Sequence, residues 1–181
     1  MKRFSQFLDD ETGTASIEFL FVFPMVFMLF TASFESSMYM ARFVMMERSV
    51  DLVVRQIRLG TLDGTSHESL KRIICRNGMM ITSVDTCAQS MKIWMQPVST
   101  TNFAMVAPPR SCVDRSQPVS VTPPGASEFA YGIDNEVMLM RICMKEDPMF
   151  PTTAISVKMP VDPVDGKVAM VVTSVFVNEP G

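Results

Sequence analysis

The sequence predicts an α+β fold in which a long N-terminal helix packs against a small antiparallel β-sheet. An apolar run of membrane-spanning length lies near the N-terminus, and an amphipathic helical pattern follows it directly. The rest of the chain contains segments that alternate apolar and polar residues, together with four cysteines. With 181 residues, the chain has room for one ordinary domain beyond the helix and for no second large one.

The apolar run covers residues 14–34 and predicts one transmembrane helix. At about 1.5 Å rise per residue it would span roughly 31 Å, close to the hydrocarbon thickness of a bilayer. Its only charged residue is Glu18, and an ionisable group near the start of a membrane helix needs compensation. The preceding residues 1–13 carry two basic and three acidic side chains, unlike the basic start of a secretory signal peptide.

The helical pattern continues beyond the membrane segment. Apolar residues recur at steps of three and four, and charged residues mark the opposite side. The stripe that should face the core consists of Phe43, Met46, Val50, Val53 and Ile57. Gly60 is a natural helix end. Residues 35–60 are therefore expected to continue the membrane helix unbroken outside the cytoplasm and to support the sheet.

A second, short helix is predicted from His67 to about Arg76. Ser66 provides the N-cap, and Asn77-Gly78 ends the helix. His67 is then an exposed residue of the first turn. Neighbouring positions at a helix start do not face one another as a nucleophile and its base must, so this serine and histidine predict no hydrolase site. We expect no catalytic residue, and the chain is predicted not to be an enzyme.

The remainder of the outer domain, residues 61–181, is expected to form the sheet. Alternation of apolar and polar residues predicts strands at 91–96, 136–144 and 167–177, and residues 154–159 would pair with the last of these across a turn at Asp165-Gly166. Spaced prolines indicate irregular loops, and residues 99–132 carry no clear periodicity.

All four cysteines follow the apolar run, which predicts up to two disulfides in an oxidising compartment and places the outer domain outside the cytoplasm. They are Cys75, Cys87, Cys112 and Cys143. Four thiols allow three pairings, of which sequence proximity favours Cys75 with Cys87 and leaves Cys112 with Cys143. No CxxC pair is present and the single histidine is not placed among the cysteines, so no zinc site, metal or other cofactor is expected.

Charge and motifs argue against several classes of partner. The formal net charge is −3, and the basic residues are scattered singly or in pairs, so no nucleic acid is expected to bind. The sequence holds no Gly-rich phosphate loop and no pair of carboxylates at a spacing that implies acid and base roles. A small-molecule substrate is therefore not expected either.

The residues just before the apolar run form a recognisable motif. Residues 13–19 read GTASIEF, with the apolar run following at once. This motif resembles the cleavage site of type IV prepilins, in particular that of the TadE-like family of tight-adherence (Tad) pilus systems. The resemblance extends to Pro24 inside the helix, to Glu35 at its apolar end, to residues 55–60 and to the C-terminal residues 175–180. Between 60 and 175 it rests on architecture alone.

The resemblance implies a function and a set of partners. A prepilin peptidase would cut between Gly13 and Thr14, removing residues 1–13 as a cytoplasmic leader, and Pro24 would kink the assembly helix. Because major pilins of this class are very short, the chain is expected to be a minor pseudopilin with a pilin-like fold. It would cross the inner membrane once, with its outer domain in the periplasm, and join the surface pilus through contacts with other subunits and the assembly platform.

Cleavage would also create a charge pair. A free α-ammonium has a pKa of about 7.7 to 8.0 and a glutamate one near 4.3, so the new N-terminus at Thr14 and Glu18 carry opposite charges at neutral pH. They can pair within one chain, one turn apart, or between neighbouring chains. Two other interpretations stay open. The chain can be an uncleaved, signal-anchored adhesin or sensor domain with Glu18 in the headgroup region, or a secreted hydrolase released near Thr31-Ala32-Ser33.

Overall fold

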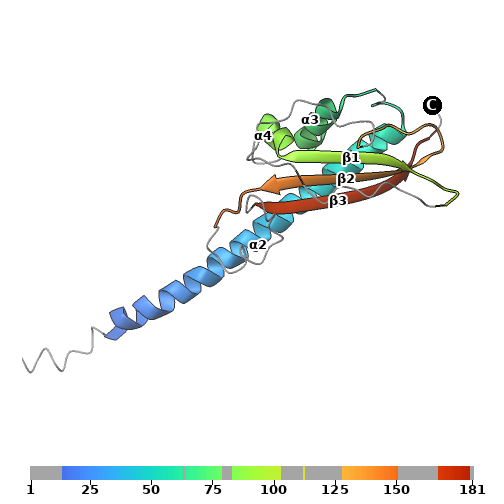
Figure 1. The fold of residues 1–181 in the computed structure, drawn as a ribbon. Helices are drawn as coiled ribbons and strands as arrows, with labels where there is room; N and C mark the ends of the chain where they lie inside the picture. Colours follow the sequence, from blue (N-terminus) through green and yellow to red (C-terminus); the bar gives the residue numbers. More distant parts are fainter. Residues whose placement is uncertain are drawn as a thin grey trace, which may run out of the picture.

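The computed structural model describes residues 14–62, 64–78, 83–102, 112, 128–150 and 167–179. The elements in chain order are α2 (Thr14–Arg58), α3 (His67–Asn77), α4 (Val84–Gln89), β1 (Met91–Val98), β2 (Val137–Glu146) and β3 (Val168–Val177) (Figure 1). The predicted leader with Gly13, and the predicted strand 154–159 with its Asp165-Gly166 turn, lie outside the described residues.

Helix α2 runs for 45 residues, and the rest of the described fold gathers on its C-terminal half (Figure 1). It ends in a Schellman motif around Gly60, which has a φ of 68°. The Gly60 amide donates to the carbonyl oxygen of Ile57 (2.9 Å), and the Thr61 amide donates to that of Gln56 (3.1 Å). Gly60 tolerates the positive φ because it has no Cβ. The predicted helix end is confirmed.

Three antiparallel strands form the sheet in the order β1-β2-β3. In the register, Met95 of β1 lies opposite Met140 of β2, which in turn lies opposite Ser174 of β3. The predicted α+β fold, with a long N-terminal helix against a small antiparallel sheet, is confirmed. The three predicted strands at 91–96, 136–144 and 167–177 all form, each shifted by no more than two residues at its ends.

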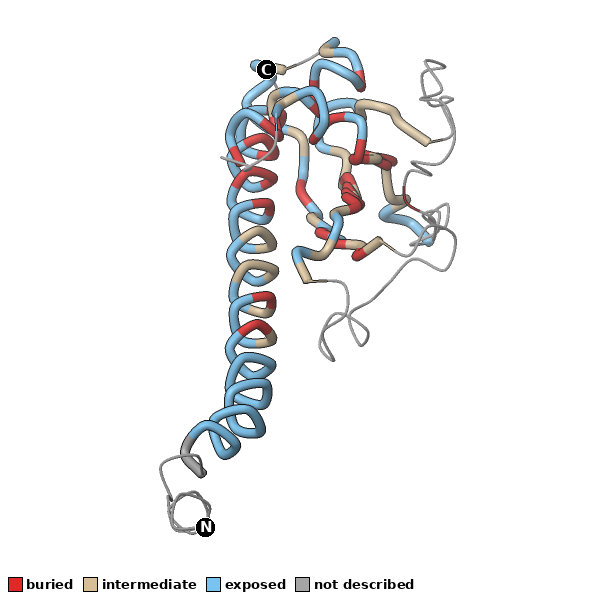
Figure 2. The backbone as a smooth tube through the Cα atoms, turned by 90° about the vertical axis from the view of Figure 1, so that its left-hand side faces the viewer, coloured by how far each residue is buried: buried red, intermediate tan, exposed pale blue. Residues whose placement is uncertain are grey.

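The core lies between one face of the sheet and the helices α2 and α3. The α2 stripe is buried as predicted at Met46, Val50, Val53 and Ile57, with Phe43 partly buried against it. The facing sheet residues are rich in methionine and comprise Met91, Ile93, Met95, Met138, Met140, Ile142, Met144, Met170, Val172 and Phe176. Unbranched thioether side chains suit the irregular space between a curved helix surface and a sheet. Figure 2 shows most of the buried positions of α2 in its C-terminal half, whereas its first turns are exposed.

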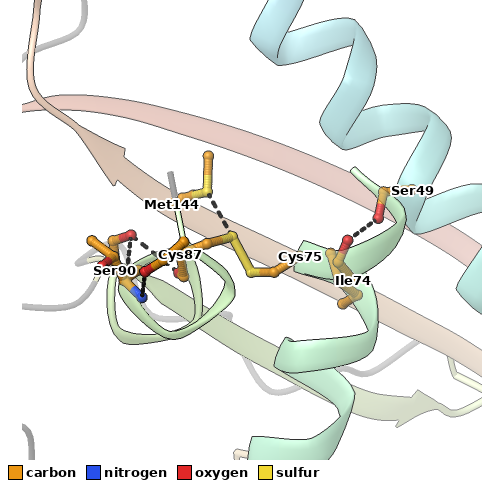
Figure 3. The surroundings of a disulfide bond; sticks show 8 residues. Ser49, Ile74, Cys75, Cys87, Ser90 and Met144 are labelled. Atoms are coloured by element: carbon orange, nitrogen blue, oxygen red, sulfur yellow. Dashed lines mark hydrogen bonds between the residues drawn. A yellow bond between two sulfur atoms is a disulfide. The ribbon is translucent and has the colours of Figure 1, made fainter. Parts of the chain in front are cut away.

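The two disulfides are Cys75–Cys87 and Cys112–Cys143, the pairing that sequence proximity favours. The first joins the end of α3 to α4, with a Cα–Cα distance of 6.0 Å, and lies over Met144 of β2 (Figure 3). Helix α4, which the sequence pattern does not predict, has Ser83 as its N-cap, and the Ser83 hydroxyl accepts a hydrogen bond from the Thr86 amide. The predicted second helix is confirmed, with Ser66 as its N-cap and Gly78 as its C-cap.

The second disulfide lies on the sheet face that points away from α2. Cys143 of β2 is 1% exposed and alternates with Ile142 and Met144, which face the core. Within the region that showed no periodicity, residues 128–130 run parallel to the outer edge of β1. The Met95 amide donates to the carbonyl oxygen of Glu128 (3.0 Å), and the Ala130 amide donates to that of Met95 (2.9 Å). This segment therefore satisfies part of the β1 edge.

Candidate functional site

The segment 17–30 of α2 is apolar apart from Glu18 and is exposed on every side of the helix (Figure 2). Its most exposed side chains include Leu20 (68%), Phe21 (74%), Met25 (71%) and Leu29 (70%). A soluble monomer does not leave so large an apolar surface in water. By length and composition, α2 can cross a membrane. Among the residues that the structure describes, it is the single helix that can do so. Its surface needs lipid or other apolar helices around it.

The predicted assembly residues lie at the start of this segment. Helix α2 begins at Thr14, and Glu18 follows one turn later with its side chain exposed. The ring of Phe19 stacks on that of Phe23 at a centroid distance of 5.1 Å, so an apolar surface adjoins the carboxylate directly. Within the described residues no side chain neutralises Glu18, and the compensation that a membrane setting requires has to come from outside them.

Pro24 lies inside the continuous helix. Its nitrogen carries no hydrogen, so the carbonyl oxygen of Leu20 loses its usual i to i+4 partner there. The hydroxyls higher in the segment are satisfied within the helix, since Thr31 Oγ1 donates to the carbonyl oxygen of Phe27 (3.0 Å) and Ser33 Oγ donates to that of Leu29 (2.9 Å). Such bonds allow hydroxyls in an apolar environment. The kink expected at Pro24 stays a prediction.

Glu35 marks the junction between the bare half of α2 and the outer domain. Its side chain is buried at 5% exposure. Oε1 accepts a hydrogen bond from the Met149 amide and Oε2 accepts one from the Phe150 amide, both at 3.0 Å. Two backbone donors thus converge on one carboxylate, one on each oxygen. The sequence singled out Glu35 only through the family resemblance and gave no sign of these partners.

Three further contacts tie the end of β2 and the residues after it to their surroundings. Arg42 of α2 pairs with Glu146 (3.6 Å), and the Lys167 ammonium, just before β3, pairs with Asp147. The ring of Phe150 meets that of Phe34 edge-on at a centroid distance of 6.3 Å. Burial raises the pKa of the Tyr39 hydroxyl, which lines the same small cavity as Glu35. The segment from 146 to 150 is thus fastened to α2 at successive levels.

His67 is buried, so the prediction of an exposed first-turn residue is wrong. Its side chain is 8% exposed, and its ring meets that of Phe129 edge-on at 5.0 Å. Nε2 donates to the carbonyl oxygen of Ile93 (3.2 Å), whereas Nδ1 lies 3.5 Å from Glu68 Oε1 and makes no hydrogen bond within the described residues. Burial, and then the nearby Lys71 charge, lower the pKa of His67. The histidine is therefore a neutral packing residue between α3, β1 and the 128–131 segment.

The predicted site residues do not converge on one place. Thr14, Glu18 and Pro24 share the bare half of α2, whereas the four cysteines lie in the outer domain as two separate disulfides. Among the described residues, no three histidine, cysteine, aspartate or glutamate side chains come together as metal ligands. The candidate interaction site is therefore the exposed apolar part of α2 together with the junction at Glu35.

Comparisons with protein-family models, curated proteins and solved structures found no match. The chain itself has a pilin-like architecture, with a long apolar N-terminal helix packed against a three-stranded antiparallel sheet. It also has an outer domain closed by two disulfides, which is typical of oxidising compartments. A membrane-length apolar helix joined to such a domain is the arrangement from which the function has to be argued.

Proposed function

We propose that this chain is a minor pseudopilin of a Tad-type pilus. A prepilin peptidase removes residues 1–13, and the mature chain is held in the inner membrane by α2 with its disulfide-bonded domain in the periplasm. From there it joins or primes the pilus through other subunits and the assembly platform, and so contributes to surface adherence. In this proposal the chain is a substrate of a peptidase and not an enzyme.

The observation that carries the proposal is the division of α2 into two halves. The C-terminal half buries Met46, Val50 and Val53 against the sheet, while the N-terminal half leaves its apolar side chains uncovered all round. One continuous helix therefore contributes to the domain core with its C-terminal half and forms an apolar stem with residues 14–34. A subunit that is stored in a bilayer and then packed among other helices needs a stem that is apolar on every side, because its apolar neighbours change.

The sequence motif adds the charge chemistry. Cleavage before Thr14 would free an ammonium group at the first residue of α2, one turn from the exposed Glu18. In an apolar environment a lone carboxylate is costly, and an ammonium from the same or a neighbouring chain neutralises it. The pairing gives a subunit a defined axial position relative to its neighbour.

The N-terminus of the mature protein tests the proposal. Mass spectrometry of the membrane fraction, from cells with and without a prepilin peptidase, should find a chain that starts at Thr14 only when the peptidase is present. Gly13→Leu should block the cut, whereas the adjacent Thr12→Leu should leave it in place. A chain that starts at Met1 in both strains would reject processing and favour an uncleaved, signal-anchored adhesin or sensor domain. A start near Phe34 would indicate a secreted protein.

A further inference from the structure

We propose that the outer domain rests on the membrane through a lipid-contacting foot formed by Phe34, Met149 and Phe150, with Glu35 as its positioning residue. The foot places the segment after β2 at the boundary between acyl chains and headgroups. The inference depends on the membrane position of α2 in the proposed function. It does not depend on cleavage after Gly13 or on incorporation into a pilus.

The level of the foot follows from its contacts with α2. The backbone amides of Met149 and Phe150 donate hydrogen bonds to the Glu35 carboxylate. The rings of Phe150 and Phe34 have their centroids 6.3 Å apart. Phe34 is the last residue of the apolar run and Glu35 is the first charged residue after it. If α2 crosses the bilayer, these residues lie where the hydrocarbon region ends. Met149 and Phe150 then lie at the same level.

The course of the chain supports this placement. Glu146 pairs with Arg42, and four residues later Phe150 meets Phe34. Arg42 and Phe34 are eight positions apart on α2, which corresponds to about 12 Å along the helix axis. The segment after β2 therefore follows α2 toward its N-terminal, membrane end. Glu146, at the end of β2, lies at the higher level beside Arg42, and Phe150 lies at the lower level beside Phe34.

The exposed chemistry of the foot suits lipid. Met149 is 49% exposed and Phe34 is 40% exposed, and Phe34 stacks on Phe30, itself 64% exposed, at 6.4 Å. The foot is thus continuous with the bare apolar half of α2, whose neighbour in a bilayer is lipid. Aromatic and other apolar side chains bind at the interface by burying area among headgroups and upper acyl carbons.

Glu35 stabilises the foot because a backbone amide without a hydrogen-bond partner is energetically costly near the hydrocarbon boundary. Two N–H groups near the hydrocarbon boundary would otherwise lack water as a partner. The buried carboxylate accepts both, one on each oxygen. Glu35 therefore does not touch lipid itself but holds the two residues that do.

Tryptophan quenching by brominated lipid tests the foot in the full chain. The protein is reconstituted in phosphatidylcholine vesicles brominated at the upper acyl carbons. Three variants are compared. They are Phe30→Trp within the apolar run, Met149→Trp in the foot, and Leu59→Trp directly after the end of α2, roughly 36 Å beyond Glu35 along the helix axis. The native Trp94, 2% exposed, supplies a constant background that is measured on the unsubstituted chain. We expect added quenching at least twofold stronger for Phe30→Trp and Met149→Trp than for Leu59→Trp.

The two controls separate this inference from the proposed function. Quenching of Phe30→Trp without quenching of Met149→Trp would overturn the foot and leave the membrane helix intact. No quenching of Phe30→Trp would reject the membrane position on which both proposals depend. Adding Glu35→Ala to Met149→Trp should reduce its quenching at least twofold, while Glu47→Ala, an exposed carboxylate on the same helix, should not. Unchanged quenching after Glu35→Ala would reject the positioning role.

Discussion

Both carboxylate oxygens of Glu35 are occupied by the backbone of the segment after β2, with the Met149 amide at 3.0 Å from Oε1 and the Phe150 amide at 3.0 Å from Oε2. The residues are 114 and 115 positions apart in the sequence. One side chain at the junction of stem and domain thus fastens a distant segment to α2. Its removal is the most direct test of what holds the domain in place.

Glu35→Ala should lower the free energy of unfolding of the outer domain by on the order of 2 to 4 kcal/mol, because two buried amides lose a charged acceptor. Urea unfolding in detergent micelles, followed by Trp94 fluorescence, measures the change. Glu35→Gln should lose less of the free energy of unfolding, because its side-chain oxygen can still accept one of the two backbone hydrogen bonds. Glu47→Ala removes an exposed carboxylate from the same helix and should stay within about 0.5 kcal/mol of the parent. Equal losses for Glu35→Ala and Glu47→Ala would contradict the role of the junction.

Loss of the Cys75–Cys87 disulfide should destabilise the domain by about 3 kcal/mol. The bond closes a short loop, with a sequence separation of 12, and so restricts the unfolded chain. The double substitution Cys75→Ala and Cys87→Ala therefore lowers the urea midpoint, and reducing agent has no further effect through this bond. The longer Cys112–Cys143 loop, with a separation of 31, should contribute slightly more, about 3.7 kcal/mol. A midpoint unchanged by either pair of substitutions would show that the bonds are not formed in the isolated protein.

His67 should make the free energy of unfolding fall as the pH drops below 6.5. Burial and the Lys71 charge lower its pKa in the folded chain below 6.5, so the unfolded chain binds the proton more tightly. Stability is therefore fully present above pH 6.5 and is lost as the pH falls through the folded pKa, with a slope of at most about 1.4 kcal/mol per pH unit. The measurement is the urea midpoint at half-unit steps of pH.

His67→Gln supplies the control, since His67 is the one histidine of the chain. The variant should have a flat profile over the same range. The neighbouring carboxylate does not interfere above pH 5: burial would raise the pKa of Glu68, but the Lys71 hydrogen bond and charge outweigh it, and the pKa lies below 4.5. A slope that persists in His67→Gln would assign the pH dependence to other groups.

What the sequence predicted well was local. The α2 stripe, the Gly60 helix end and the three strands each follow from periodicity or capping within a few residues, and all are present. Helix α4 was missed because its six residues are too short to show a helical period, although Ser83 is a good N-cap. The pairing of the cysteines was favoured by proximity along the chain, and the structure has that pairing.

What the sequence did not predict depends on distant residues. His67 is buried because Phe129 covers its ring and Ile93 accepts from Nε2, and neither residue is near it in sequence. Glu35 was visible as a carboxylate after an apolar run, but its two amide donors follow β2. Neither relationship has a local pattern, because each arises from how the sheet and its loops lie on α2.

Glu18→Ala should leave cleavage after Gly13 intact but reduce incorporation into the pilus. The substitution removes the only charged group of the apolar run and so leaves the new ammonium at Thr14 without its carboxylate. In low dielectric a lone buried charge costs on the order of 3 to 5 kcal/mol, enough to reduce assembly more than a hundredfold at equilibrium.

The measurement for Glu18→Ala has two parts. Mass spectrometry of the membrane fraction checks that the N-terminus is still Thr14, and immunoblotting of sheared pili gives the incorporated amount relative to the membrane pool. Glu47→Ala, an exposed carboxylate far from the stem, serves as the matched control and should behave as the parent. Because Glu18 contacts nothing in the outer domain among the described residues, the urea midpoint of that domain should not move. Normal incorporation of a correctly processed Glu18→Ala chain would show that the stem assembles through apolar packing alone, with no charge pair defining the axial position of the subunit.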